Sequence, residues 1–200
     1  MLKIEKEYLE EFGDIPITPQ GRMDYILKQV NLSRAKSSVF ERIKMIQSIK
    51  WKSLEYTIYL LPKATPRPRS GNGIFYVKGA KDNKKIFEKY FKERDDLSLI
   101  YTPCKFFCNT YYPIPSSMNS VDKIISELGF IRPISKPDWD NVAKAYCDMI
   151  QGTLLYDDSL IIEGVSKKFY SIKPRIEIRI EYMEEFDSDF NKHKILKKVR

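Results

Sequence analysis

The sequence predicts an α/β (α+β) fold, in which strands and helices follow one another behind a helical N-terminal extension. Two patterns carry this prediction. Apolar residues recur at helical spacing in the first 52 residues, and apolar and charged residues alternate across 175–182, as in a strand with one buried face. The 200 residues suffice for one domain with appendages. We predict an extension over residues 1–53, a main domain over 54–185 and a charged tail over 186–200.

The N-terminal extension is predicted to be helical. Met23, Ile26 and Leu27 recur at helical spacing, and Phe40 and Ile43 begin a second, less regular series. The stretch Ile-Pro-Ile-Thr-Pro at residues 15–19 separates a first helix from a second. No catalytic motif stands out in this part of the chain.

The main domain is predicted to begin with a strand at residues 56–61, followed by a loop rich in proline, glycine and arginine. Helices and strands then follow in turn, and Gly129 and Gly152 are predicted to end the helices that precede them. The predicted elements are a short strand at 74–77, a helix at 81–94 with Ile86, Phe87, Tyr90 and Phe91 inward, a strand at 97–112, helices at 119–128 and 141–151, and strands at 161–170 and 175–182.

Positive charge is concentrated in one segment. The chain has a formal net charge of +8, and residues 62–94 carry ten lysines and arginines against three aspartates and glutamates, a net charge of +7. This basic segment favours an anionic partner, with nucleic acid as the first candidate.

The single histidine and the three cysteines disfavour several kinds of chemistry. His193 lies in the charged tail, where it suits neither a histidine–metal nuclease, a zinc hydrolase nor a Ser–His–Asp enzyme. Three cysteines form no disulfide framework, no signal peptide opens the chain, and no apolar run is long enough to cross a membrane. We therefore expect a cytoplasmic protein with no membrane partner, whose catalysis would rely on carboxylates, lysines or a metal held by oxygen.

Carboxylates gather around the helix predicted from residue 141. Pro137 favours an extended chain, in which Asp138 and Asp140 point to the same side, and Asp140 is also predicted to cap the helix. The polar residues of the helix fall on one stripe, formed by Asn141, Lys144 and Asp148. A second acidic pair, Asp157 and Asp158, follows the helix.

Carboxylates held close together repel one another unless a cation binds between them. Mg²⁺, or alternatively Mn²⁺, takes such oxygen ligands and often a phosphate oxygen as well. Lys144, one turn after Asp140, would then stabilise the negative charge that builds up on a phosphoryl group. The alternative interpretation is structural: Asp140 is a cap, Lys144 is a salt-bridge partner, and Asp157 with Asp158 forms a turn.

The stretch KPDWDNVAKAYCDMIQGTLLYDDSLIIEGVSKKFY at residues 136–170 resembles the core of the RusA-type Holliday junction resolvases, including the RusA-like nucleases of prophages. The shared pattern is a basic residue, D-x-D-N, a lysine four residues after the second aspartate, a helix with an aspartate, and two aspartates before a strand. The resemblance runs from about residue 56 to residue 182 and includes the loop PKATPRPRSGNGIFY. The N-terminal extension and residues 114–135 lie outside the family's compact core.

This resemblance implies a Mg²⁺-dependent, homodimeric endonuclease with a mixed β-sheet flanked by helices. Two symmetric sites would nick opposed strands of a four-way DNA junction. The implied catalytic residues are Asp138, Asp140, Lys144 and Asp158, with the three aspartates as metal ligands, Asp157 as an alternative ligand, and Asp148 and Asn141 in support. The predicted DNA contacts are Arg67, Arg69, Lys81, Lys84, Lys85, Lys136, Lys167 and Lys168.

Two other functions remain open at the level of the sequence. Pro137 and Asp138 could begin a nuclease site of the PD-(D/E)xK type, but the required D/E-x-K is missing at a useful spacing, and Glu177-Ile178-Arg179 is a poor substitute. A non-catalytic nucleic-acid-binding protein would account for the basic charge, yet it would leave the aspartates unexplained.

Overall fold

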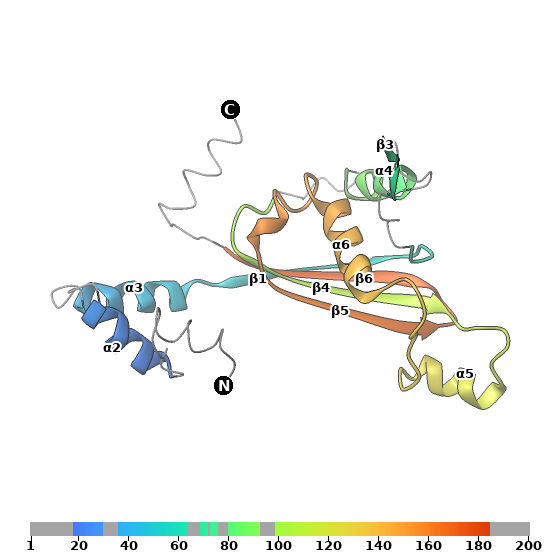
Figure 1. Ribbon diagram of the computed structural model, residues 1–200, viewed down its shortest axis with the longest axis horizontal. Helices are drawn as coiled ribbons and strands as arrows, with labels where there is room; N and C mark the ends of the chain where they lie inside the picture. The colour runs from blue at the N-terminus through green and yellow to red at the C-terminus, as the bar shows by residue number, and fades with distance from the viewer. Residues whose placement is uncertain are drawn as a thin grey trace. The chain divides into compact units, whose positions relative to one another are not determined.

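The computed structural model describes residues 18–29, 36–63, 69–71, 73–75, 80–92 and 99–184. The chain divides into two compact units, Met1–Ile49 and Lys50–Arg200. The first unit contains helices α2 (Pro19–Gln29) and α3 (Lys36–Ser48), as the apolar spacing predicts (Figure 1). The Thr18 hydroxyl accepts a hydrogen bond from the Gly21 backbone N–H (3.1 Å) and so caps α2. The helix predicted before residue 15 lies outside the described residues.

The second unit is built on a four-stranded sheet with the strand order β1-β6-β4-β5 (Figure 1). Its strands are β1 (Trp51–Ile58), β4 (Cys104–Pro113), β5 (Ile161–Ser171) and β6 (Arg175–Met183). β6 pairs antiparallel with β1 and β4, whereas β4 and β5 are parallel. A parallel pair needs a crossover connection, which here contains α5 (Ser120–Glu127) and α6 (Trp139–Ile150). The predicted mixed sheet flanked by helices is confirmed.

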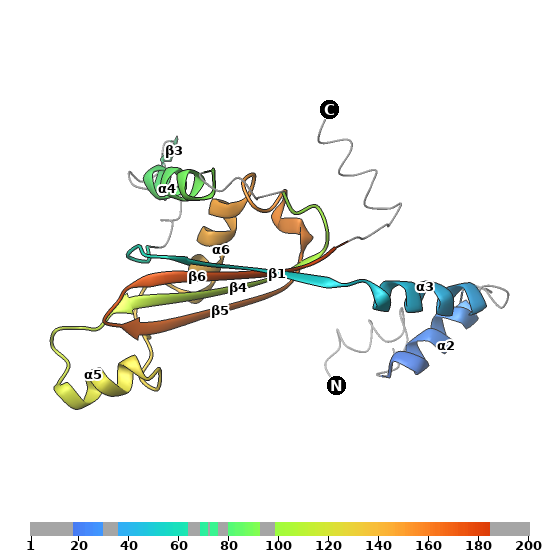
Figure 2. The same ribbon diagram turned by 180° about the vertical axis from the view of Figure 1, so that it is seen from behind.

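One face of the sheet is buried beneath α6 and α4 (Ala80–Lys92), which lie on the same side of it (Figure 2). Alternate residues of β4 and β6 point into this core, because side chains alternate along a strand. The core includes Val142, Ala145, Tyr146, Met149 and Ile150 of α6, Phe87 and Phe91 of α4, Cys104, Phe106 and Cys108 of β4, and Ile176, Ile178 and Ile180 of β6. The packing of its apolar side therefore fixes α6 on the sheet.

The first strand of the sheet lies earlier in the chain than predicted. β1 begins at Trp51, which pairs with Met183 of β6, so the predicted helical stretch ends before residue 51. The predicted strand ran on to residue 61, but β1 ends at Ile58, and the side chains of Tyr59 and Leu61 beyond it are 73% and 52% exposed. The position of β1 is decided by its pairing with a strand at the far end of the chain, and this pairing leaves no local pattern.

Three further elements differ from the prediction in detail. The predicted loop and short strand form a small hairpin of β2 (Arg69–Gly71) and β3 (Gly73–Phe75). β4 begins after Pro103, which has no backbone N–H to contribute to a ladder. On α4, Ile86 is 44% exposed instead of inward, because Phe87 and Phe91, one turn apart, form the buried stripe.

The helix predicted at residues 119–128 is confirmed as α5. The Asn119 side chain accepts a hydrogen bond from the Asp122 backbone N–H (2.8 Å), and Gly129, with a φ of 83°, follows the end of the helix. In the part of the chain that the structure describes, no helix is both long enough and apolar enough to cross a membrane.

Ile178→Ala is expected to lower the free energy of unfolding by about 2–5 kcal/mol, because it leaves a cavity in the core. Ile178 is 1% exposed on β6, between β1 and β4. Urea unfolding measures the change. Ile172→Ala is the matched control, since its side chain is 74% exposed, and its effect should stay within about 0.5 kcal/mol. Equal effects of the two substitutions would contradict the described core.

Candidate active site

The two aspartates of the D-x-D motif lie at the start of α6. Asp138 occupies the N-cap position with an extended backbone (φ −63°, ψ 150°) and makes no side-chain capping hydrogen bond, while Asp140 lies in the first turn. The prediction that Asp140 caps the helix is therefore wrong. The prediction that Asp138 and Asp140 lie in one extended segment is also wrong, because Asp140 is already helical. The helix begins earlier, at Trp139, whose indole N–H donates to the Ser166 carbonyl (2.7 Å) and fixes this start on β5.

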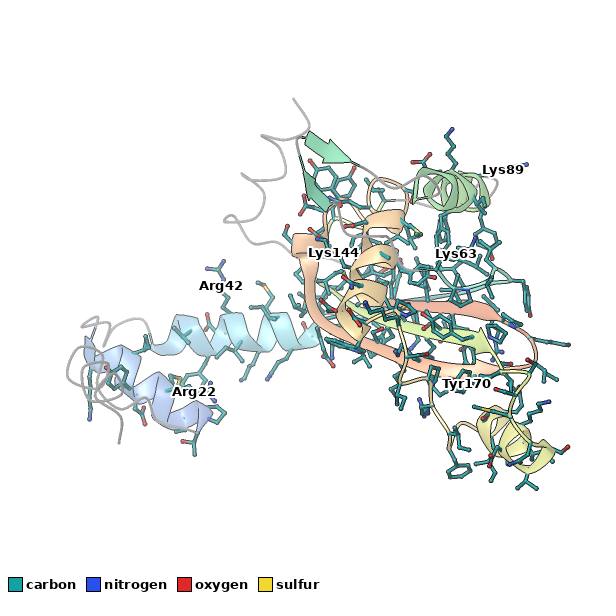
Figure 3. All side chains as sticks on the ribbon, turned by 45° about the vertical axis from the view of Figure 1, so that its right-hand side comes forward. Arg22, Arg42, Lys63, Lys89, Lys144 and Tyr170 are labelled. Atoms are coloured by element: carbon teal, nitrogen blue, oxygen red, sulfur yellow. The ribbon has the colours of Figure 1, made fainter. Side chains whose placement is uncertain are left out.

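Polar side chains form a stripe along α6, as their spacing predicts. Asp140, Lys144 and Asp148 follow one another at intervals of one turn, and Lys144 is exposed (Figure 3). The Asn141 amide nitrogen lies 3.5 Å from the Asp138 carboxylate, to which it donates a long hydrogen bond. Because the apolar side of α6 is buried against the sheet, this polar stripe faces away from the core.

The second acidic pair lies at the 3₁₀ turn η2 (Asp158–Leu160). Asp157 is the N-cap of this turn, and its carboxylate accepts a hydrogen bond from the Ser159 backbone N–H (3.0 Å). Asp158 is exposed in the turn itself. Spacing left both aspartates open as candidate ligands. The local hydrogen bond engages Asp157 in the turn and makes Asp158 the better candidate.

Asp158 lies near the C-terminal end of α6, because Gln151, the C-cap of the helix, forms a β-bridge with Leu155, three residues before Asp158. Burial, and to a smaller extent the carboxylates of Asp148 and Asp158, raise the pKa of the Cys147 thiol to about 12. Lys144 acts on the same thiol in the opposite direction. The three charged groups therefore lie close enough to Cys147 to influence it, and η2 lies beside the second half of α6.

The oxygen donors at the start of α6 fit a hard divalent ion. Asp138 and Asp140 are both exposed. Mg²⁺ is commonly held by one or two carboxylates, with waters and phosphate oxygens in its other positions. Within the described ranges, no three His, Cys, Asp or Glu side chains form a group that could hold a metal ion by themselves. A metal site here would therefore need oxygens from the substrate or from water.

The basic segment, residues 62–94, contacts α6 near the beginning and near the end of the segment. The hydroxyl of Tyr146, which is buried on α6, accepts a hydrogen bond from the Lys63 backbone N–H (3.2 Å) and donates one to the Lys63 carbonyl (3.4 Å). Near the other end, the Phe87 ring of α4 packs against the Tyr146 ring, with 5.7 Å between centroids. The segment is thus attached to the buried side of α6 at Lys63 and at Phe87, two of its described residues.

The structure describes only some of the predicted DNA contacts. Lys85 is exposed on α4, and Lys136 is exposed in the loop before α6. Arg67 lies outside the described residues, as do the side chains of Arg69, Lys81 and Lys84.

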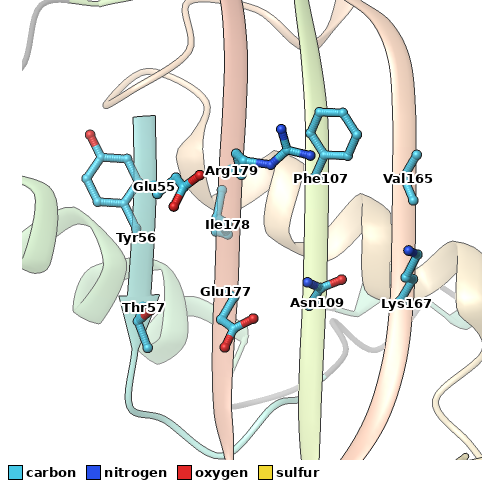
Figure 4. A pocket seen from close by; sticks show the side chains of 10 residues that line it. All are labelled: Glu55, Tyr56, Thr57, Phe107, Asn109, Val165, Lys167, Glu177, Ile178 and Arg179. Atoms are coloured by element: carbon cyan, nitrogen blue, oxygen red, sulfur yellow. The ribbon is translucent and has the colours of Figure 1, made fainter. Parts of the chain in front are cut away.

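Lys167 and Lys168, both predicted DNA contacts, point to opposite faces of the sheet. They are neighbours on β5, where successive side chains alternate. Lys167 lines a hollow of about 590 Å³ with Glu177 and Arg179, on the face away from α6 (Figure 4). Lys168 instead donates to backbone carbonyls in the loop before α6. The two lysines therefore do not share a face of the sheet, and their role as DNA contacts stays a prediction.

Three contacts that anchor the site have no counterpart in the sequence predictions. They are made by the Trp139 indole, the Tyr146 hydroxyl and the Lys168 ammonium. The contact of the Tyr146 hydroxyl could have been suspected, because a buried Tyr usually finds a hydrogen-bond partner for its polar atom, whereas Trp139 is 57% exposed. Nothing in the sequence indicates that the Lys168 ammonium binds backbone carbonyls of this loop.

A carboxylate pair at a helix start, a lysine one turn further and an attached basic segment suit a hydrolase of phosphodiesters. The family model "Endodeoxyribonuclease RusA" matches residues 60–181. The chain is also 31% identical over 135 residues to the uncharacterized protein YqaN of Bacillus subtilis (strain 168), covering 64% of this chain and 94% of that protein. The chain belongs to the RusA endodeoxyribonuclease family. These nucleases act on branched DNA and generally depend on a divalent metal ion.

Proposed function

We propose that this protein is a Mg²⁺-dependent endonuclease that resolves four-way DNA junctions by paired symmetric nicks, in DNA recombination and repair. The observation that carries the proposal is the family match over residues 60–181, because it spans the α6 carboxylates, Lys144, Asp158 and most of the basic segment. The hydrogen bonds between Lys63 and Tyr146 support it, since they attach the start of the basic segment to α6. Branched DNA would thereby be attracted to the surface that carries the acids.

Asp138 and Asp140 are the proposed ligands at the start of α6. Asp158, which does not form one group with them in this structure, is proposed to join them when the metal ion and the DNA phosphate bind. Mn²⁺ is the alternative ion. When bound, the ion supplies Lewis-acid charge and a water activated for attack on phosphorus. Lys144, on the next turn of the helix, would balance the negative charge that grows on the phosphoryl oxygens.

The remainder of α6 supports this chemistry. Asn141 orients the Asp138 carboxylate through its side-chain amide. The N-terminal end of the helix favours a bound phosphate, because backbone N–H groups without helical partners and the positive end of the helix dipole meet there. Asp148, two turns after Asp140, continues the polar stripe toward Cys147 and η2.

Paired nicks require two sites, so we propose that two copies of the chain act together as a homodimer. Light scattering of the purified chain is expected to give twice its mass of 23.6 kDa. The proposed phosphate contacts of each copy are Arg67, Arg69, Lys81, Lys84, Lys85 and Lys136. Such contacts orient DNA without reading its sequence.

A synthetic four-way junction incubated with the full-length chain tests this function. With Mg²⁺ or Mn²⁺ we expect resolution into two nicked duplexes, cut at symmetric positions, and no cutting when divalent metal is left out. Binding without cutting under both ions would contradict the proposed enzyme. Equally fast cutting of a linear duplex of the same sequence would contradict the junction preference and would indicate a general nuclease.

A further inference from the structure

Strand β5 directs Lys168 toward the loop that leads into α6. Lys168 pairs with Thr110, which is buried on the face of the sheet that α6 covers. Its half-buried side chain donates hydrogen bonds to the backbone carbonyls of Ser135 (2.9 Å) and Pro137 (3.0 Å). The Pro137 carbonyl belongs to the peptide group that joins Pro137 to Asp138. The ammonium therefore holds the backbone directly beside the first of the proposed metal ligands.

We propose that Lys168 is a positioning residue for these aspartates, an inference that rests on the function proposed above. A lysine ammonium has three hydrogen-bond donors, and two carbonyls of the loop already occupy donors of Lys168. Hydrogen bonds from a charged donor are stronger than those between neutral groups. Lys168 thus fixes the loop and is not a contact to DNA phosphate.

Other residues of β5 also contact the loop before α6 and the start of the helix. On the far side of Asp138, the Trp139 indole N–H donates to the Ser166 carbonyl (2.7 Å), so β5 grips the chain before and after this aspartate. Earlier in the loop, the Arg132 guanidinium stacks 3.8 Å from the centre of the Phe169 ring and donates to the Lys168 carbonyl (3.4 Å). The loop is therefore tied to β5 at several successive residues.

These hydrogen bonds from β5 matter because the start of α6 lacks a side-chain capping hydrogen bond. Asp138 occupies the N-cap without a side-chain capping bond, and among the described residues its carboxylate is held only by the long hydrogen bond from Asn141, so its position depends strongly on the backbone on either side. A metal ligand is effective only where surrounding hydrogen bonds hold it in place. Removal of the Lys168 ammonium should displace Asp138 and slow cleavage, while the contacts proposed to bind DNA in the basic segment remain.

Lys168→Met, which removes the ammonium and keeps the side-chain length, tests the proposal. We expect single-turnover cleavage of a four-way junction to fall by about 10- to 100-fold. Lys168→Arg, which keeps a cationic donor, should recover part of the rate. Lys173→Met removes the same charge from an exposed residue in the turn after β5 and serves as the control. Junction affinity, measured without divalent metal, should be equal in Lys168→Met and Lys173→Met.

Amide hydrogen exchange of the full chain gives a readout that needs no activity. Lys168→Met is expected to speed exchange at Val142, whose N–H donates to the Asp138 carbonyl (3.2 Å) in the first turn of α6. Exchange at Ile178, in the middle of the sheet, should not change, and Lys173→Met should change neither amide. If the wild-type chain cuts no junction, the proposed function fails, and the exchange at Val142 still decides whether Lys168 positions this turn.

Two results would overturn the assignment of Lys168. A loss of junction affinity as large as the loss of cleavage rate would make Lys168 a phosphate contact. Unchanged exchange at Val142 would show that the helix start does not depend on the ammonium. Should circular dichroism show that Lys168→Met does not fold, Lys168→Gln, which keeps amide donors at this position, takes its place in the same measurements.

Discussion

Asp140→Asn is expected to abolish junction cleavage while it preserves junction binding. The substitution removes one charge of the proposed ligand pair and keeps the size of the side chain. We expect the cleavage rate to fall by roughly 10²–10⁴-fold, because metal-ion stabilisation of a transition state contributes several kcal/mol. Affinity should stay the same or rise, since a negative charge that faces the DNA backbone is removed. Single-turnover cleavage and titration of a labelled junction measure the two effects.

The melting temperature of this variant separates chemistry from helix stability. Asp140 lies in the first turn of α6 and not at its cap, so its helix-dipole interaction, worth about 0.3–1 kcal/mol, opposes the relief of repulsion with Asp138. We expect a melting temperature close to that of the wild type. Asp122→Asn, in the first turn of α5, is the matched control and should cleave normally. A clear fall in both melting temperature and affinity would make Asp140 a structural residue.

Elements that carry their own pattern were predictable from the sequence. The alternation along β6 follows from the burial of Ile176, Ile178 and Ile180 against the helices, which requires every second residue to be apolar. The bounds of α5 follow from its cap at Asn119 and the glycine at residue 129. In both cases the physical cause lies within a few residues of the element.

Features decided by contacts between distant segments were not predictable. β1 begins where it pairs with the end of β6, and α6 begins where the Trp139 indole meets Ser166 of β5. The second contact changed which aspartate occupies the N-cap. The contacts of the Lys168 ammonium with the loop before α6 are of the same kind, because a lysine next to Lys167 in the sequence gave no sign of them.

The candidate site was predictable to a similar extent. The stripe of Asn141, Lys144 and Asp148 follows from helical spacing alone, whereas the preference for Asp158 over Asp157 came only from resemblance. The structure adds a physical reason, since the Asp157 carboxylate accepts the Ser159 N–H. Spacing could not show this difference, because adjacent aspartates in a turn are equivalent until the backbone around them is known.

Lys144→Met is expected to reduce junction cleavage by about 10²–10³-fold, the loss typical when one donor to a developing negative charge is removed. Lys144 is exposed on α6, one turn after Asp140. A charge that acts mainly on the transition state should lower kcat and leave KM nearly unchanged.

The salt dependence of binding distinguishes this role from ordinary phosphate binding. If the Lys144 ammonium bound a DNA phosphate, Lys144→Met would weaken binding and lower the slope of log affinity against log salt by about one. We expect an unchanged slope and only partial rescue by Lys144→Arg, because the planar guanidinium places its charge differently. Lys123→Met, on α5, removes the same charge elsewhere and should change neither cleavage nor slope. A lower slope with a proportional fall in cleavage would assign Lys144 to DNA binding and leave the chemistry to Asp138, Asp140, Asp158 and the metal ion.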